Sequence, residues 1–292
     1  TPLHILWNLA NEWFTANATW LDTPFPQVRA DIMNQFMIQA TKKVTKLRRE
    51  LNNKLLMDGV LKPLAKQIES FKEKCPLIVK LRHPGIKTKH WEEISQIVGF
   101  EVMPSMELNL QGFLNLNLEK WSDQIFEIAN IAALEYSLES SLDQMDNELQ
   151  TLQFITVEFN DSNQYILQQI DDIISTIDDQ LVTTQTLLSS PYIKPMKKRA
   201  NDKLSFLHTA HETLDAWVNC QKSWLYLQPI FTGTSIQQKL YKEAMQWSTV
   251  ASICSSLMEH THIHPEFFTV MSRDNILPNL KKCNDLLDSI TK

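Results

Sequence analysis

Residues 200–231 read ANDKLSFLHTAHETLDAWVNCQKSWLYLQPIF, and this stretch decides the fold because it predicts one long helix with two apolar flanks. One stripe at helical spacing contains Leu204, Leu207, His211, Leu214, Val218 and Leu225, and the other contains Ala210, Trp217, Cys220, Trp224 and Leu227. A helix that is apolar on two flanks packs against neighbours on more than one side. Pro229 is expected to stop this helix, because a prolyl nitrogen has no hydrogen to donate and its ring clashes with the preceding turn. We therefore expect the other elements to stack on or beside it.

The composition of the chain indicates a mainly α protein with a substantial core. Hydrophobic residues make up 43% of the 292 residues, and only 5 are Gly, whereas strand-rich folds need many special turn positions. Acidic and basic residues are interspersed around a net charge of −6, which indicates neither nucleic acid nor an anionic membrane as a partner. No run of the sequence approaches the roughly 20 apolar residues that a membrane span requires.

Most of the remaining chain repeats apolar residues at helical spacing between predicted breaks. The breaks are expected at residues 23–26 (TPFP), 57–59 (MDG), 75–76 (CP) and 103–105 (MPS). A helix is expected to begin near Thr88 and end at Gly99, and a long one to run from about Leu116 to Leu149. The predicted apolar face of the helix after the first break contains Val28, Ile32, Phe36, Ala40, Leu47, Leu51 and Leu55.

One segment carries a strand signal. Residues 154–159 (FITVEF) are β-branched and aromatic, residues 160–163 (NDSN) have turn chemistry, and residues 164–167 (QYIL) can return as a second strand. An isolated hairpin is marginally stable, so this one is expected to lean on a helix or a neighbouring domain. The predicted fold is thus mainly α, an elongated arm of packed helical bundles with one small β-hairpin.

Candidate chemical sites are few. The four cysteines, Cys75, Cys220, Cys254 and Cys283, are far apart and form no CxxC pair, so we interpret them as free, buried thiols in a reducing compartment. The histidines of EHTHIHPE, His260, His262 and His264, would point to one side of an extended loop, which a metal could exploit. Nothing else in the sequence completes such a site, and surface histidines are the favoured interpretation.

Other polar clusters are expected to be structural or solvated. His208 and His211 lack the spacing of a zinc-protease helix, and the pairs Asp171/Asp172 and Asp178/Asp179 are better explained as an acidic helix face. The basic cluster contains Lys42, Lys43, Lys46, Arg48 and Arg49, and is either a solvated helix face, which we favour, or a surface for a partner. Trp91, Trp121, Trp217 and Trp224 are either interface anchors or, as we favour, core residues.

The sequence offers no catalytic motif. None of the glycines stands in a GxxxxGK[ST] or GxGxxG context, and no GxSxG elbow occurs. We therefore predict no catalytic, cofactor-binding or metal-binding residue within these 292 residues.

Two blocks of the sequence resemble the dynein heavy chain family. Residues 82–94, RHPGIKTKHWEEI, resemble the family's (N/H)PG-x(3–4)-HW-x-x-I block, and residues 217–231, WVNCQKSWLYLQPIF, resemble its W-x3-Q-x2-W-x-YL-x-PIF block. The residues that match are Pro84, Gly85, His90, Trp91, Trp217, Gln221, Trp224, Tyr226, Leu227, Pro229 and Phe231. The resemblance begins at about residue 57, although the LYKEA sequence at residues 240–244 departs from the family's usual LPxE.

The resemblance implies a mechanical role. The matching region in dyneins is the linker, a helical arm between the tail and the AAA+ motor ring. The sequence of these residues resembles axonemal heavy chains more than cytoplasmic ones. It implies no catalytic residue and no cofactor in this segment. The resemblance places ATP with Mg in the ring of the parent chain, which agrees with the missing P-loop in these residues. The implied partners are that ring, dynein intermediate and light chains and other heavy chains through the tail, and microtubules. The implied location is the cytoskeleton of the cytoplasm, in the axoneme of a cilium or flagellum.

The domain prediction follows from the same resemblance. Residues 1–56 are expected to form a helical segment at the junction of tail and linker, and residues 57–292 a linker-like arm that is truncated at its C-terminal end. Because Thr1 is not an initiator Met, we expect a piece of a larger protein. A stiff arm bends at breaks between bundles, so Pro84–Gly85, Met103–Gln111 and Ser189–Pro195 are hinge candidates, each with an ordinary loop as the alternative.

Overall fold

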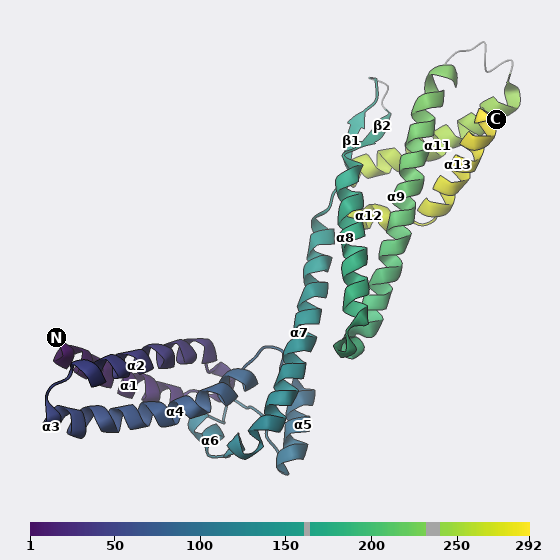
Figure 1. Cartoon of the computed structure of the whole chain (residues 1–292). Helices are drawn as coiled ribbons and strands as arrows, with labels where there is room; N and C mark the ends of the chain where they lie inside the picture. Colours follow the sequence, from purple (N-terminus) through teal and green to yellow (C-terminus); the bar gives the residue numbers. More distant parts are fainter. Residues whose placement is uncertain (161–163, 232–239) are drawn as a thin grey trace. The chain divides into compact units, whose positions relative to one another are not determined.

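The structure, a computed structural model, describes residues 1–160, 164–231 and 240–292, and it is mainly helical (Figure 1). The elements of the N-terminal half are α1 (Pro2–Asp22), η1 (Phe25–Gln27), α2 (Ala30–Glu50), α3 (Lys54–Leu56), η2 (Met57–Leu61), α4 (Lys62–Leu81), α5 (Thr88–Val98), α6 (Leu110–Leu114), η3 (Leu118–Trp121) and α7 (Ser122–Thr151). The others are β1 (Ile155–Glu158), β2 (Tyr165–Gln168), α8 (Ile170–Ser189), η4 (Pro191–Met196), α9 (Lys197–Phe231), α11 (Tyr241–Ile263), α12 (Phe267–Met271) and α13 (Ile276–Thr291). The prediction of a mainly α fold with one β-hairpin is confirmed.

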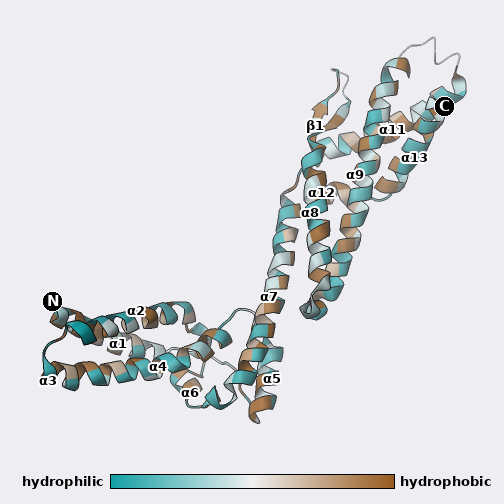
Figure 2. Ribbon diagram, viewed as in Figure 1, coloured by the Kyte–Doolittle hydropathy of each residue, from teal (hydrophilic) through white to brown (hydrophobic). Residues whose placement is uncertain are grey.

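The chain divides into two compact units, Thr1–Ser137 and Leu138–Lys292, and the division falls inside α7. Each unit has a hydrophobic core of its own. Hydrophobic and hydrophilic residues alternate along the helices, as expected for amphipathic elements that bury one side (Figure 2). The predicted domain boundary between residues 56 and 57 was based on where the resemblance to the dynein family begins and not on compactness, so it stays a prediction.

The first unit is built on the packing of α1, α2 and α4. Four aromatic rings from these helices interlock: Trp13 meets Phe71 edge to face at 5.5 Å, and Trp20 stacks on Phe71 at 5.7 Å and meets Phe36 at 5.3 Å. Such aromatic pairs stabilise a core beyond the area that they bury. The predicted break at residues 23–26 is confirmed, since η1 follows α1 there.

Two predicted breaks in the first unit are wrong. Residues 57–59 do not interrupt the helix but lie in the π-helix η2, which continues directly into α4. Pro76 also lies inside α4, which runs on to Leu81. The lost hydrogen bond at Pro76 is offset by burial on the same turn, where Ile78 is fully buried and Cys75 donates its thiol to the Phe71 carbonyl at 3.4 Å.

The buried face of α2 also differs from the predicted one. Ala40 and Leu47 are buried as expected, but Ile32 is exposed, and so is Leu55 in α3. The true face contains Ala30, Met33, Met37, Ala40, Val44 and Leu47. This set alternates steps of three and four residues and so keeps the 3.6-residue period, whereas the predicted set advanced by four residues at every step from Val28 to Ala40 and therefore drifted around the helix.

The rest of the first unit follows the sequence closely. α5 ends at Gly99, whose φ of 84° is the left-handed conformation that a glycine cap adopts without steric cost. The loop at Met103–Ser105 is confirmed. α7 begins at Ser122 rather than near Leu116, because Leu116 and Asn117 end the turn after α6 and η3 comes first.

The second unit is organised around α9, which packs against α8 and α13, while α11 packs against α13 (Figure 1). The predicted stripe of Ala210, Trp217, Cys220, Trp224 and Leu227 is buried throughout. Leu207 and Leu214 of the other stripe are also buried. The prediction that Pro229 stops the helix is wrong, because α9 passes through it and is described to Phe231, which is buried.

Near the start of α9, charged groups from α7 and α9 are paired. Asp146 of α7 accepts from Lys203 at 2.6 Å, and Arg199 lies 2.7 Å from Asp143. Burial raises the pKa of Asp146, but hydrogen bonds from Lys203 and Arg199 outweigh that effect and hold this pKa below its ordinary value. The ion pair therefore joins the C-terminal part of α7 to α9 within this unit.

The predicted hairpin is present, with β1 and β2 antiparallel and Val157 opposite Ile166. Its predicted turn falls on residues 161–163, which lie outside the described residues. Phe154, just before β1, donates its backbone N–H to the Pro265 carbonyl at 2.7 Å, and Phe267 donates to Leu152 at 3.0 Å. The hairpin thus leans on helical neighbours, as expected.

The remaining loops differ in part from the predictions. The expected loop at residues 190–195 is the short helix η4, in which Ile193 is buried. The FTGT sequence of residues 231–234 predicts a turn, and Ser235 a helix cap, but of these residues only Phe231 is described, and it is helical. The three hinge candidates each lie within one unit: for example, Leu108 and Leu110 exchange backbone hydrogen bonds with Phe25 and Thr23 at 2.8 and 2.9 Å.

No helix among the described residues combines the length and the apolar character that crossing a membrane demands.

Candidate functional site

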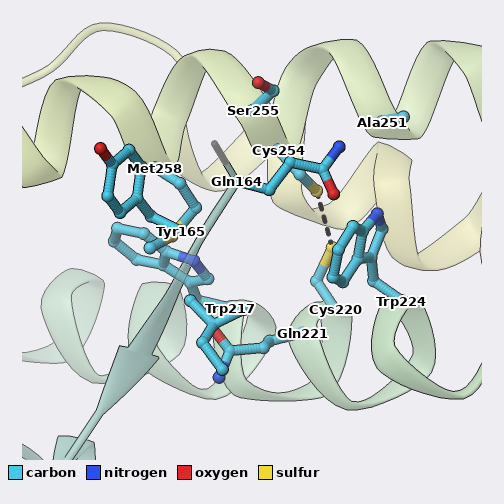
Figure 3. Close-up of a pocket in the computed structure, with 11 residues that line it drawn as sticks. Gln164, Tyr165, Trp217, Cys220, Gln221, Trp224, Ala251, Cys254, Ser255 and Met258 are labelled. Carbon is cyan, nitrogen blue, oxygen red and sulfur yellow. Dashed lines mark hydrogen bonds between the residues drawn. The ribbon is translucent and has the colours of Figure 1, made fainter. Parts of the chain in front are cut away.

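Residues 217–231, the second block that resembles dynein heavy chains, lie in α9, and one face of this part of the helix holds the β-hairpin in place. Gln221 makes two hydrogen bonds to the backbone of Leu167 in β2: its Oε1 accepts from the Leu167 N–H at 2.7 Å, and its Nε2 donates to the Leu167 carbonyl at 3.0 Å. The amide therefore satisfies the strand's edge much as a neighbouring strand would. Figure 3 shows Gln221 on the same helix as Trp217 and Trp224.

The two tryptophans on either side of Gln221 pack against aromatic rings of other elements. Trp217 lies 5.5 Å from the Phe154 ring, and Trp224 lies 5.5 Å from Phe159. Trp224 also stacks on Trp247 of α11 at 6.1 Å. Trp217 and Trp224 are 3% and 7% exposed, so the core interpretation of these side chains is confirmed. Spacings of four and three residues place Trp217, Gln221 and Trp224 on one helix face, which explains why the block needs this order.

The end of this block shows a mixed pattern. Leu227 is buried, and Phe231 stacks on Trp247 at 5.2 Å. Tyr226 is 69% exposed. Its packing therefore does not explain its place in the block.

A small cavity of about 30 Å³ lies between α9, α11 and β2. Figure 3 shows its lining, with Gln164, Tyr165, Trp217, Cys220, Gln221, Trp224, Ala251, Cys254, Ser255 and Met258 labelled. This volume has room for about one water molecule. Trp224 lines this cavity, and its buried indole Nε1 has no hydrogen-bond acceptor among the described residues.

The cysteines Cys220, Cys254 and Cys283 come together beside this cavity from α9, α11 and α13. Their Sγ atoms all lie within 4.8 Å of one another, and those of Cys220 and Cys254 are 3.5 Å apart, as the dashed line in Figure 3 marks. Cys220 and Cys283 are buried and Cys254 is half-buried. Cys75, in the first unit, is buried by itself, and burial raises the pKa of its thiol to about 11.

The clustered thiols interact electrostatically. Hydrogen bonds from Cys220 and then Cys254 lower the pKa of Cys283, because they stabilise its thiolate. The pKa of Cys254 is raised, first by its hydrogen bonds to Cys220 and Cys283 and then by burial, since these favour the protonated thiol. The three groups therefore do not titrate as independent cysteines.

The first sequence block forms a tight junction with α7 inside the first unit. A Cβ atom added to Gly85 would clash with the backbone carbonyl of Ala132 and lie 2.7 Å from the Tyr136 Cβ, so only glycine fits here. The Gly85 N–H donates to His83 Nδ1 at 3.0 Å, and the His83 ring meets Tyr136 edge to face at 5.5 Å. Pro84 is part of this turn.

His90 and Trp91 extend the junction into the core. His90 is 2% exposed, and its Nδ1 accepts from the Lys87 N–H at 3.0 Å, which leaves Nε2 at 3.4 Å from Glu135 on α7. Burial, with the nearby charge of Lys89, lowers the pKa of His90 more than Glu135 raises it. Trp91 packs edge to face on Phe25 at 6.0 Å.

Comparison with known proteins covers the whole chain. Residues 1–292 match the family described as dynein heavy chain, N-terminal region 2. The chain belongs to this family. Dynein axonemal heavy chain 1 of Homo sapiens is 32% identical over 291 residues, covering 100% of this chain and 7% of that relative. Dynein axonemal heavy chains 3 and 6 of Homo sapiens are each 30% identical over 291 and 290 residues, again covering 7% of their length. The chain thus spans about 7% of the length of these relatives, and the predicted kinship with dynein heavy chains is confirmed.

In this dynein family chain, the histidines that were considered as metal ligands are part of a helix end and its packing. The histidines of the EHTHIHPE segment do not lie on one side of a loop: His260 and His262 are in the last turn of α11, and His264 caps it. His262 stacks on Tyr165 at 3.9 Å and shares a hydrogen bond with Thr156 at 2.9 Å. The extended arrangement was wrong because the helix continues almost to Pro265.

The remaining polar clusters form ion pairs. His211 lies 3.1 Å from Asp178 and 3.5 Å from Asp215. In the basic cluster, Lys43 pairs with Glu12 at 2.7 Å and Arg48 with Glu69 at 2.9 Å. These exposed pairs fit the solvated face that we favoured, and whether the cluster also binds a partner stays untested.

The cysteine cluster is the feature that the sequence did not reveal. Its members are separated by 34 and 29 residues, and no short spacing links them (254 − 220 and 283 − 254). Each lies on an apolar helical face, which is the only signal available, and such faces usually mean ordinary burial. Their convergence depends on how α9, α11 and α13 pack.

Proposed function

We propose that this chain is part of the linker of a dynein heavy chain, an arm that carries conformational change of the AAA+ ring to the tail. In this role it contributes to minus-end-directed movement along microtubules, in the axoneme of a cilium or flagellum, without catalysing a reaction itself. ATP and Mg act in the ring of the parent chain. The tail carries the contacts to intermediate chains, light chains and other heavy chains.

The observation that carries this proposal is what the family blocks do in the fold. Gly85 seats a turn against α7, His90 and Trp91 extend that junction, and Trp217, Gln221 and Trp224 tie the hairpin to the bundle. These residues hold elements to one another inside closely packed units. Because packed interiors deform little, residues of this kind suit a part that transmits force.

Helix α7 adds support. Its 30 residues correspond to about 45 Å at 1.5 Å per residue. Ile125 and Ile128 belong to the core of the first unit, whereas Leu149 belongs to the core of the second. The helix therefore contributes buried residues to both cores.

Energy transfer in the full heavy chain tests the proposal. A donor dye is placed by an unnatural amino acid at Val182 of α8, which is 64% exposed, so that the native cysteines stay unlabelled. The acceptor is a fluorescent ADP, bound with or without vanadate. The linker role predicts that the transfer efficiency changes between the two nucleotide states, because the arm moves relative to the ring.

A pair inside one unit is the control. Dyes at Val182 and at Tyr241, which is 73% exposed and lies in the same unit, are expected to keep a constant distance in both states. Constant transfer from Val182 to the nucleotide as well would contradict the linker role, and would favour the alternative of a helical scaffold that only tethers subunits.

A further inference from the structure

The three clustered cysteines have a geometry that ordinary burial does not require. Cys220, Cys254 and Cys283 come from three different helices; the sulfur atoms of Cys220 and Cys254 are 3.5 Å apart, and all three lie within 4.8 Å of one another. In a tetrahedral zinc site the Zn–S bonds are about 2.3 Å long, which places the sulfur atoms about 3.8 Å from one another. The Cys220–Cys254 distance is about 0.3 Å below that value and the limit for all pairs is about 1.0 Å above it, so a single ion reaches all three sulfurs with small side-chain adjustments.

A disulfide explains the cluster less well. The Cys220 and Cys254 sulfurs are 3.5 Å apart, whereas a disulfide bond is about 2.05 Å long. Such a bond would use only two of the thiols and would leave Cys283 beside it without a role. A metal ion uses all three and needs no oxidant.

The adjacent cavity provides space for a further ligand. Cys220 and Cys254 both line it, and its volume of about 30 Å³ accommodates about one water molecule. Trp224 lines the same cavity with a buried indole N–H that has no acceptor in the described part of the chain. A water molecule or small anion completing the coordination would find a hydrogen-bond donor there.

We propose that Cys220, Cys254 and Cys283 bind one thiophilic d10 metal ion, Zn²⁺ or Cu⁺, which joins α9, α11 and α13. Thiolate ligands select these ions over Mg²⁺ and Ca²⁺, whose preferred ligands are oxygen atoms. The ion is structural: it cross-links the helices of the second unit below the hairpin, and its binding energy adds to the stability of that unit.

Metal analysis of the full heavy chain tests the site. The protein is purified under reducing conditions, incubated with Zn²⁺ or, without oxygen, with Cu⁺, desalted, and measured by mass spectrometry of the elements. Wild type is compared with Cys220→Ala, Cys254→Ala and Cys283→Ala, and with Cys75→Ala as a matched control that removes a buried thiol elsewhere. Each cluster variant is expected to hold about one equivalent less metal than wild type, since a three-sulfur site holds one ion. Cys75→Ala is expected to lose no metal. The incubation, with Zn²⁺ or with Cu⁺, that gives the higher metal content of the wild-type protein identifies the ion.

A measurement on unmodified protein covers the case in which a variant fails to fold. Co²⁺ added to the wild-type chain is expected to give intense thiolate-to-metal charge-transfer absorption, which zinc then displaces. Equal metal content in wild type and all three cluster variants would overturn the proposal. Binding of neither ion by the wild-type protein would also overturn it. So would a Cys220–Cys254 disulfide that persists in metal-free protein purified under reducing conditions.

Discussion

Replacing Gly85 by Ala should destabilise the first unit by about 2–3 kcal/mol, at the upper end of the range for overpacking. The added Cβ would overlap the Ala132 carbonyl and lie 2.7 Å from the Tyr136 Cβ, whereas carbon atoms in contact normally lie about 3.5–4.0 Å apart. Both neighbours belong to the rigid frame of α7 and cannot rotate away. The strain is steric, because among the described glycines only Gly99 has a positive φ.

Gly59→Ala is the matched control, and it should act in the opposite direction. A Cβ at Gly59 meets no atom within 4 Å, and the residue lies in a helical segment. Removing a glycine from such a position stabilises a helix by about 0.5–1 kcal/mol. The two Gly→Ala variants are therefore expected to differ by about 3 kcal/mol, although they make the same chemical change.

Hydrogen exchange measured by mass spectrometry reports on the first unit alone, which global melting of a two-unit chain does not. For Gly85→Ala, amides of α5 and of the turn before it should exchange about 30- to 140-fold faster, since 1.4 kcal/mol corresponds to a tenfold change. Gly59→Ala should not speed the exchange of α5, and its stabilisation of the same unit should slow that exchange by about two- to fivefold. Equal exchange of α5 in both variants would show that the junction between Gly85 and α7 is not packed as described.

The other predictions concern the two family blocks. Trp224→Ala should cost about 3–5 kcal/mol, because it removes a buried ring that stacks on Trp247; a melting temperature close to wild type would contradict this. Gln221→Leu should cost about 2 kcal/mol and speed hydrogen exchange at Leu167, because it leaves that backbone without its partners; unchanged protection of β2 would refute the role of the amide. Burial lowers the pKa of His90 below its ordinary value of 6.5. As the pH falls, the His90 side chain is therefore protonated in the unfolded chain before it is protonated in the folded one, so its contribution to the free energy of unfolding is fully present above about pH 6.5 and is lost below it. His90→Gln should flatten that decline when the exchange protection of α5, corrected for the intrinsic effect of pH on exchange, is compared across this range, and an unchanged slope would exclude His90 as its source.

Local pattern was enough to predict two elements of the second unit. The apolar stripe on α9 follows from spacings of three and four residues, and the β-hairpin follows from β-branched and aromatic residues on either side of a turn sequence; both are present. Gly99 ends α5 as predicted, because the left-handed conformation at that point excludes most other residues.

The failures arise where packing overrides a local signal. Pro76 and Pro229 weaken a helix locally, yet α4 and α9 continue through them because residues on the following turn, such as Ile78 and Phe231, are buried. At Gly59 the chain accommodates a π-helical turn instead of breaking. Local propensity is a weak prior against tertiary burial.

The candidate site shows the same division. The sequence blocks identified Gln221 and the two tryptophans, but not that the amide binds β2, because that contact joins residues 54 positions apart. The thiol cluster depends on the packing of three helices and left no spacing to detect. Gly85, in contrast, could be singled out from its Pro-Gly turn, and the structure adds the reason that no side chain fits.

The most direct test of force transmission compares motion with ATP turnover in the full heavy chain. Ser137→Pro places a residue that costs about 3 kcal/mol or more and kinks the helix into the interior of α7, and Ser137→Ala is the control that preserves it. The account predicts that Ser137→Pro slows microtubule gliding strongly while ATP hydrolysis stays near the wild-type rate, and that Ser137→Ala changes neither. Gliding at wild-type speed in the proline variant, or a loss of hydrolysis in step with gliding, would contradict it.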